Sequence, residues 1–94
     1  MASSSPMFPF EKLRGRENFD VWKRHANSYL TIKHCWKPIE TPLQNEPKET
    51  EVEADERAHA ELILLIEPSN FAHIATANSS YEAWNAFLAA YEDK

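Results

Sequence analysis

The chain has 94 residues, of which 43% are hydrophobic and 12% aromatic, so it holds one domain with one core and is not generally disordered. Its formal net charge of −5 argues against a free nucleic-acid binder, because an acidic surface repels the phosphate backbone. The presence of one glycine and one cysteine disfavours a small sheet-rich fold with tight turns and excludes an internal disulfide.

Residues 1–9 are rich in Ser and Pro, which predicts a flexible tail ahead of a helical domain over residues 10–94. Residues 10–16 are expected to be an irregular entry, with Gly15 at a turn that needs a positive φ. A first helix is predicted from about residue 18 to about residue 34, with Asn18 as its N-cap. One apolar stripe along this helix comprises Phe19, Trp22, Ala26, Tyr29, Leu30 and Lys33.

Three prolines predict a loop over residues 37–48, pinned to the core by Trp36, Ile39 and Leu43. A second helix is predicted to start at Thr50 with a capping box that ends at Glu53. The acidic residues of its first turns are expected to be solvated, and its apolar end, with Ile63 and Leu64, to be buried nearly all round. The acidic set is Glu49, Glu51, Glu53, Asp55 and Glu56.

A short third helix carrying Phe71 is predicted after Pro68, with Ser69 as its cap. A fourth helix is predicted to begin at a second capping box, Ser79 to Glu82. Its stripe comprises Ala83, Trp84, Phe87, Leu88 and Tyr91. The predicted fold class is therefore all-α: a compact bundle of about four helices with a flexible N-terminal tail.

No pattern of catalytic, metal-binding or cofactor-binding residues emerges. Cys35 and His34 are adjacent, and adjacent residues in a helix rarely point at each other. The four histidines lack a close ligand spacing, and one glycine cannot form a phosphate-binding loop. We expect neither catalytic residues, nor a metal, nor a cofactor, nor a small-molecule substrate. The absence of an 18-residue apolar run argues against a membrane span, and the lone cysteine fits a reducing setting in the cytoplasm or nucleus.

Charge is unevenly spread. Residues 1–37 carry seven Lys/Arg against three Asp/Glu, and residues 38–94 carry three against twelve. The halves are either two solvated faces or surfaces that attract each other, within one copy or between copies. A candidate electrostatic patch in the basic half comprises Lys12, Arg14, Arg16, Lys23 and Arg24. The patch would give at most weak nucleic-acid binding, because the aromatic residues interleaved with it belong to the predicted core.

Two segments carry a family resemblance. Residues 10–23 (FEKLRGRENFDVWK) and residues 77–92 (ANSSYEAWNAFLAAYE) resemble the opening and closing helical motifs of the Gag (capsid) proteins of copia-type LTR retrotransposons. Residues 58–74 look like the central pair of helices of that family. The resemblance implies a compact helical lobe, like the N-terminal lobe of a capsid protein, that assembles with copies of itself. It implies RNA binding only through regions beyond this chain.

The core signature expected from the resemblance comprises Leu13, Gly15, Phe19, Trp22, Leu62, Ile66, Trp84 and Tyr91. The residues expected to be exposed, as a candidate interaction surface, are Trp36, Ile39, Leu43 and Phe71. The first hypothesis is a non-catalytic Gag-type lobe that self-associates. The alternatives are a host protein derived from such a Gag, acting as an adaptor for a different protein, and a weak nucleic-acid-binding module.

Overall fold

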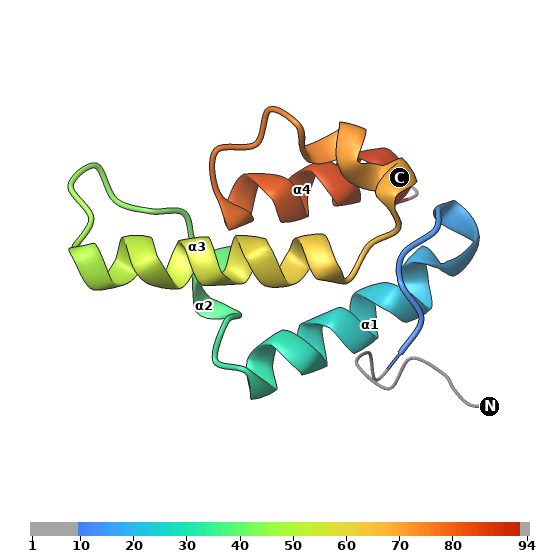
Figure 1. The fold of residues 1–94 in the computed structure, drawn as a ribbon, viewed down its shortest axis with the longest axis horizontal. Helices are drawn as coiled ribbons and strands as arrows, with labels where there is room; N and C mark the ends of the chain where they lie inside the picture. The colour runs from blue at the N-terminus through green and yellow to red at the C-terminus, as the bar shows by residue number, and fades with distance from the viewer. Residues whose placement is uncertain (1–9, 93–94) are drawn as a thin grey trace.

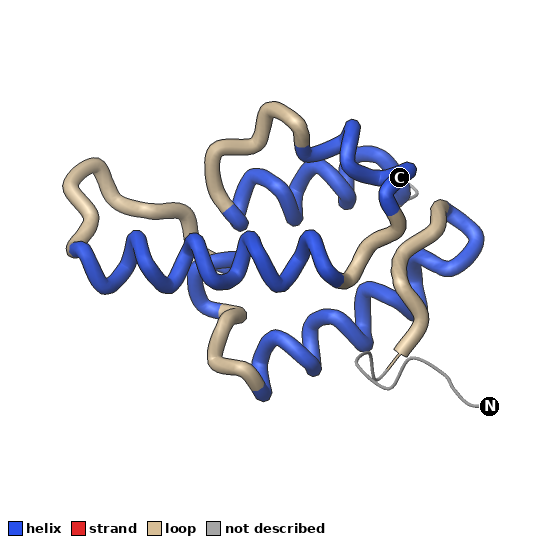
Figure 2. Tube along the Cα trace, in the orientation of Figure 1, coloured by secondary structure: helices blue, strands red, loops and turns tan. Residues whose placement is uncertain are grey.

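The computed structural model describes residues 10–92, and this part of the chain is all-helical, as predicted (Figure 2). Within it, one isolated β-bridge joins Leu13 to Ile66, and no β-strand forms. The tail predicted for residues 1–9 lies outside the described residues. In chain order the elements are the helices α1 (Arg16–Ile32), α2 (Lys37–Glu40) and α3 (Glu49–Leu64), the 3₁₀ helix η1 (Pro68–Ile74), and α4 (Ser80–Tyr91).

Helix α3 crosses the middle of the molecule, with α1 on one side and α4 on the other (Figure 1). Helix α4 packs against η1, α2 and α3. The molecule is elongated, with extents of 47 × 31 × 20 Å. Part of this length comes from the first turns of α3 and the loop before them, which project beyond α1 and α4 (Figure 1).

A single apolar core joins all five elements. Six members of the predicted core signature are at most 8% exposed, whereas Tyr91 is half-buried and Gly15 is the N-cap of α1. The buried hydrophobic residues are Leu13, Phe19, Trp22, Ala26, Leu30, Cys35, Ile39, Ala58, Leu62, Leu65, Ile66, Ile74, Ala83, Trp84 and Phe87.

Trp22 occupies the centre of this core. Its indole stacks on Trp84 with ring centroids 5.6 Å apart, and it meets Phe87 edge-on at 5.8 Å. Its Nε1–H donates a 2.8 Å hydrogen bond to the Leu65 carbonyl, so the polar end of the buried ring is satisfied. The same segment bonds Leu13 on both sides, through the Leu65 carbonyl and the Glu67 N–H. The entry segment, α1 and the end of α3 are therefore fixed together.

Helix α1 starts and ends two residues earlier than predicted, at Arg16 and Ile32. Asn18 is not the N-cap; from the first turn, its Oδ1 accepts bonds from the N–H groups of Arg14 and Gly15. Its Nδ2 donates to the Lys12 carbonyl, so one side chain holds the whole entry turn. The prediction of a positive φ at Gly15 was wrong, since its φ of 176° is extended.

The left-handed residue lies instead at the other end of α1. His34 has a φ of 61°. The Cys35 N–H bonds back to the Leu30 carbonyl and the His34 N–H to the Thr31 carbonyl. These two bonds are those of a Schellman motif, which normally places glycine at the left-handed position. This motif ends α1 and turns the chain towards α2.

The segment predicted as a loop contains the short helix α2. Pro38 lies in its first turn, where the missing N–H would have no helical partner in any case. The single turn directs Ile39 into the core at 1% exposure. The loop is therefore shorter than predicted and runs from Thr41 to Lys48.

Helix α3 begins at Glu49, and its capping bond joins the Lys48 N–H to the Glu51 carboxylate at 2.8 Å instead of the predicted Thr50–Glu53 pair. Its end is not buried all round, since Ile63 is 38% and Leu64 55% exposed. Ile63 lies at a groove between α3 and η1.

Asp55 corrects a further prediction. It was expected in solvent, but it is only 6% exposed. Its Oδ1 accepts hydrogen bonds from the Ser80 N–H at 2.9 Å and from the Ser80 hydroxyl at 2.5 Å. This carboxylate binds the first turn of α4 to the middle of α3, and a buried carboxylate needs such partners.

The start of α4 agrees with the prediction, because the Ser79 hydroxyl accepts the Glu82 N–H. The preceding element is a 3₁₀ helix whose cap is Glu67, not Ser69. Its Asn70 is fully buried. The Asn70 Nδ2 donates to the Leu13 carbonyl, and the amide oxygen accepts the Tyr91 hydroxyl. Asn70 therefore joins the entry segment to the end of α4.

Candidate interaction surfaces

The four residues predicted to form an interaction surface do not form one surface. Ile39 is buried in the core and cannot contact a partner, which corrects that prediction. Trp36 and Leu43 are half-buried, and Phe71 is 44% exposed. Trp36, Leu43 and Phe71 line three different grooves.

The first groove lies between α1 and α4 and has a volume of about 460 Å³; we call it the aromatic groove. Trp36 meets Trp84 edge-on at 5.1 Å, and with Leu88 these rings provide its apolar surface. Its α1 side carries two cations and two polar side chains. The lining residues are Lys23, Arg24, Asn27, Ser28, Trp36, Trp84, Leu88 and Glu92.

The two cations of the aromatic groove differ in their ion pairing. Lys23 forms an ion pair with Glu92 and lies 5.6 Å from the Phe19 ring centroid. Arg24 is exposed, and no carboxylate among residues 10–92 pairs with it. The groove therefore presents one uncompensated guanidinium beside an aromatic surface.

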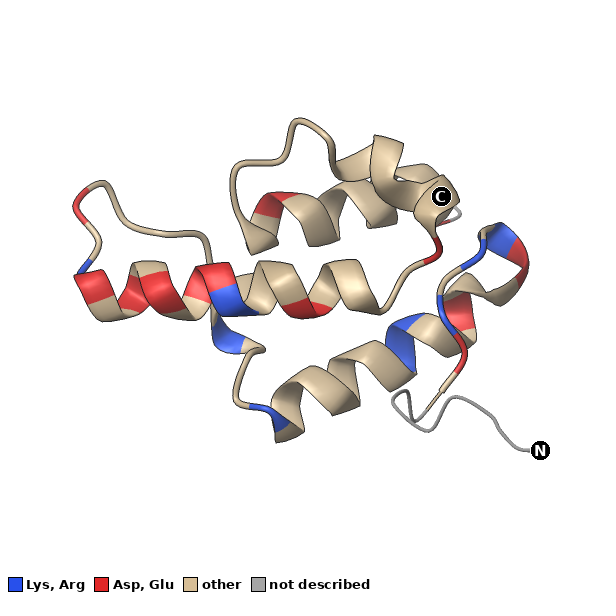
Figure 3. Cartoon of the chain, in the orientation of Figure 1, with Lys and Arg blue, Asp and Glu red and all other residues tan. Residues whose placement is uncertain are grey.

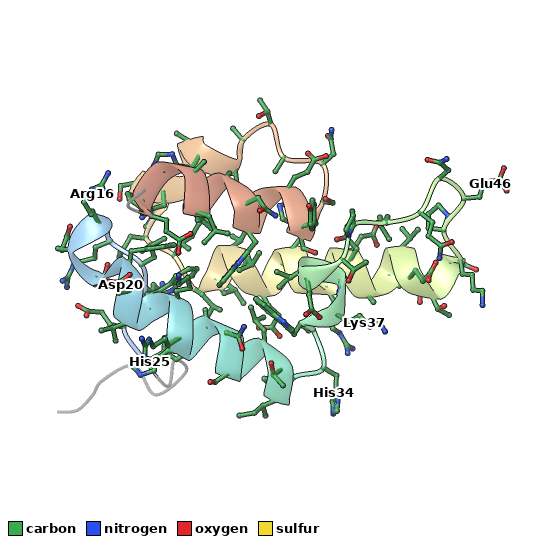
Figure 4. All side chains as sticks on the ribbon, turned by 180° about the vertical axis from the view of Figure 1, so that it is seen from behind. Arg16, Asp20, His25, His34, Lys37 and Glu46 are labelled. Carbon is green, nitrogen blue, oxygen red and sulfur yellow. The ribbon has the colours of Figure 1, made fainter. Side chains whose placement is uncertain are left out.

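The second groove lies between α2, the following loop and the first turns of α3. It has a volume of about 490 Å³, and Pro38, Pro42, Leu43 and Ala54 provide its apolar side. Beside it, residues 44–53 form the projecting part of the molecule, which we call the acidic arm. Acidic residues, coloured red in Figure 3, recur along this arm, and Glu46 lies at its tip (Figure 4).

The third groove is apolar and lies between α3 and η1. It is lined by Ile63, Phe71, Ile74, Ala75 and His59. The buried Nε2 atom of His59 has no hydrogen-bond partner among the described residues. Ile63 and Phe71 therefore expose large apolar side chains at a shallow groove.

The predicted electrostatic patch is divided by contacts within the chain. Arg14 pairs with Glu11 and lies 3.6 Å from the Glu17 carboxylate. Arg16 donates to the carbonyls of Ala90 and Tyr91, at 3.4 Å and 3.2 Å, at the end of α4. A cation there complements the negative end of the helix dipole.

The Lys23–Glu92 ion pair is an attraction between the basic and the acidic half that acts within one copy. Lys12 is half-buried, and Arg24 is the patch member that lies exposed in the aromatic groove without a carboxylate partner among the described residues.

Among residues 10–92, three groups have raised pKa values, and in each case burial is the main cause. The pKa of Cys35 rises through burial and then through the nearby Glu61 carboxylate. The pKa of Tyr29 rises through burial and through its 3.1 Å hydrogen bond to Glu61. The pKa of Tyr91 also rises through burial and then through Glu17. All three groups stay protonated near neutral pH.

The candidate chemical groups are dispersed. Cys35 is 1% exposed, and its thiol contacts the Lys33 carbonyl at 3.6 Å, whereas the His34 side chain points away from the fold (Figure 4). His25 packs on Phe10 and His73 on Tyr91. Over residues 10–92, no three His, Cys, Asp or Glu side chains gather closely enough to hold a metal ion. None of the described helices combines the length and apolarity needed to cross a membrane.

Comparisons of the chain with protein-family models, with curated proteins and with solved structures found no match.

Proposed function

We propose that this chain is a non-catalytic protein-interaction domain of the Gag (capsid) type, whose role is self-association in a capsid-like assembly. The proposal places it in the cytoplasm or nucleus, with a second copy as its main partner. RNA would be reached only through regions beyond this chain.

The observation that carries the proposal is the exposure of large apolar side chains on a folded, core-forming domain. Ile63, Leu64 and Phe71 are 38%, 55% and 44% exposed, and Trp36 and Leu88 lie in the aromatic groove. Two of these side chains, Ile63 and Phe71, lie together at the groove between α3 and η1, and grouped apolar exposure is typical of protein contact sites.

The residues that carry the family resemblance support the proposal in a second way. Trp22 and Trp84 stack at the centre of the core, and Leu13 and Phe19 are buried beside them. The two resembling segments thus supply the interior of one lobe. The surface formed by the residues between these segments is then available for contact with a partner.

Light scattering coupled to gel filtration tests the proposal. We expect the average mass to rise above that of a 10.9 kDa monomer as protein concentration increases, and to respond to salt where charged contacts contribute. A monomeric mass at every concentration, in both low and high salt, would contradict self-association.

A second candidate function is an adaptor that binds a different protein, and the apolar groove of Ile63 and Phe71 is the observation that favours it. Grooves between helices accept the apolar face of an amphipathic helix. Stoichiometry separates the two candidates, because an adaptor gives a one-to-one complex with a heterologous partner while its own self-association stays weak.

A further inference from the structure

The aromatic groove lacks one component, a carboxylate for Arg24. Lys23 already pairs with Glu92, whereas Arg24 is exposed without a carboxylate partner among the described residues. An arginine at the edge of an aromatic surface suits an acidic segment that also brings an apolar group. The groove therefore suits an occupant that carries a carboxylate beside an apolar group.

The acidic arm of the same chain has the complementary chemistry. Between residues 46 and 53 it carries four Glu against one Lys. Glu46, Glu49 and Glu53 are exposed, and within residues 10–92 none has an ion-pair partner. At the tip, Glu46 stands next to Pro47. Aromatic-lined grooves accept proline-containing extended segments, because the rigid ring packs on indole faces at low entropic cost.

The arm does not occupy the groove of its own chain. It projects past the ends of α1 and α4 (Figure 1), and Glu46 lies at the opposite end of the molecule from Arg16 (Figure 4). A charged segment that extends from the body in this way can contact a neighbouring molecule.

We propose that the acidic arm of one copy docks in the aromatic groove of the next copy, with Glu46 paired to Arg24 and Pro47 against Trp36. This inference rests on the proposed self-association and specifies its geometry. Arm and groove are different surfaces, so the contact is head-to-tail. Each copy has one of each, and repetition gives a ring or an open chain.

Two charge-reversed forms of the full chain test the contact separately. Arg24→Glu alters only the groove, and Glu46→Lys with Glu53→Lys alters only the arm. We expect each form to self-associate at least about tenfold more weakly than the unmodified chain, because a favourable charge pair becomes a repulsive one. Far-UV circular dichroism would test whether both forms are folded. We expect that they are, because all three substituted side chains are exposed.

Net charge provides the controls. Arg57→Glu makes the same charge change as Arg24→Glu at an exposed position outside arm and groove, and it should leave association unchanged. The arm variant brings the net charge closer to zero, which by itself promotes association. A loss of association in the arm variant would therefore come from a specific contact.

Mixing the two forms gives the decisive result. The Arg24→Glu form has an unmodified acidic arm, and the arm variant has an unmodified aromatic groove. An equimolar mixture should therefore form a one-to-one complex and no larger assembly. With the arm variant labelled with ¹⁵N, the Trp36 indole N–H signal should shift when the Arg24→Glu form is added, and it should not shift when a form carrying both sets of changes is added.

The other outcomes are separable. If the unmodified chain associates and the two forms associate equally well, the head-to-tail contact is wrong and the proposed self-association stands. Weakened forms that fail to complement each other would also overturn the inference, because a two-fold or non-specific contact would be indicated. A folded, strictly monomeric unmodified chain would overturn both proposals.

Discussion

His34 is a residue whose backbone conformation conflicts with its side chain. Its φ of 61° is the left-handed conformation, which for a residue with a Cβ is strained by roughly 1–2 kcal/mol. The Schellman hydrogen bonds of His34 and Cys35 require this conformation. The side chain points away from the fold (Figure 4), and within residues 10–92 the imidazole makes no hydrogen bond or ion pair that would offset the strain.

Substitution His34→Gly should therefore stabilise the protein. Glycine adopts the left-handed conformation freely but loses more entropy on folding, so the net gain should be about 0.5–1 kcal/mol. Urea denaturation followed by tryptophan fluorescence would show a higher midpoint at an unchanged slope. Substitution His25→Gly, inside α1, should instead destabilise by about 1 kcal/mol or more, because it places glycine in a helix interior and also removes the ring contact with Phe10. A lower midpoint for His34→Gly would mean that the imidazole makes a stabilising contact.

Cys35 should be an unreactive thiol in the folded protein. It is 1% exposed, and burial together with the Glu61 carboxylate raises its pKa. Reaction requires an accessible thiolate. At pH 8, a disulfide reagent should react with the native chain at least about a hundredfold more slowly than with the urea-unfolded chain. Equal rates would show that the end of α1 opens readily.

The same thiol gives stability a pH dependence with a defined sign. The folded state holds the proton more tightly than the unfolded chain does, so the contribution is complete below the ordinary pKa of 9.0 and is lost as pH rises through the higher folded pKa. Urea midpoints should fall between pH 8 and strongly alkaline pH. Cys35→Ala should reduce that fall, while the raised pKa values of Tyr29 and Tyr91 should leave part of it. An identical fall in Cys35→Ala would contradict the assignment.

At the scale of elements, the orientation of α4 on α3 depends on one buried carboxylate. Asp55 accepts the N–H and the hydroxyl of Ser80, and both residues are nearly inaccessible to water. Asp55→Ala leaves two buried donors unsatisfied and should destabilise by about 2–4 kcal/mol.

A double-mutant cycle would separate that contact from the loss of packing. Ser80→Ala removes the hydroxyl, and the Asp55→Ala/Ser80→Ala chain should be less destabilised than the sum of the single changes, with a coupling of about 0.5–3 kcal/mol. Chemical denaturation measures all four free energies. Additive effects would show that the hydroxyl bond contributes nothing beyond the backbone bond.

The elements that local chemistry determines could be predicted from the sequence. Ser79 caps α4 because its hydroxyl reaches an N–H three residues later. The observed starts of α1 and α3 differ from the predicted ones because the capping side chains follow the residues that they cap instead of preceding them. In each helix a first-turn side chain, Asn18 or Glu51, accepts N–H groups of the residues before it. An N-cap residue and a first-turn residue of this kind look alike in sequence.

Features that depend on distant partners could not be predicted. The acidic residues around Asp55 in the sequence are typical of a solvated helix start. Its hydrogen-bond partner, Ser80, lies 25 residues away along the chain. Ile63 and Leu64 remain exposed at the end of α3, because apolar character alone does not place a residue inside. Two residues of the aromatic groove, Trp36 and Arg24, could be predicted from the sequence as candidate site residues. Only the tertiary arrangement puts them in one groove and places Ile39 in the core.

At the scale of the whole molecule, stability and self-association should be linked. A contact made only by folded copies stabilises the folded state by mass action, by about 1.4 kcal/mol when the free concentration is ten times Kd. In a domain of this size each kcal/mol raises Tm by roughly 4–8 °C. The Tm of the unmodified chain should therefore rise with protein concentration.

The variants of the arm-to-groove contact give this prediction its specificity. In Arg24→Glu the Tm should be independent of concentration over the same range, while Arg57→Glu should follow the unmodified chain. Differential scanning fluorimetry on the three tryptophans reports the transition directly, because Trp22 and Trp84 lie in the core and Trp36 in the groove. A Tm that is constant with concentration for the unmodified chain would contradict self-association over that range, because contacts between folded copies must stabilise the folded state.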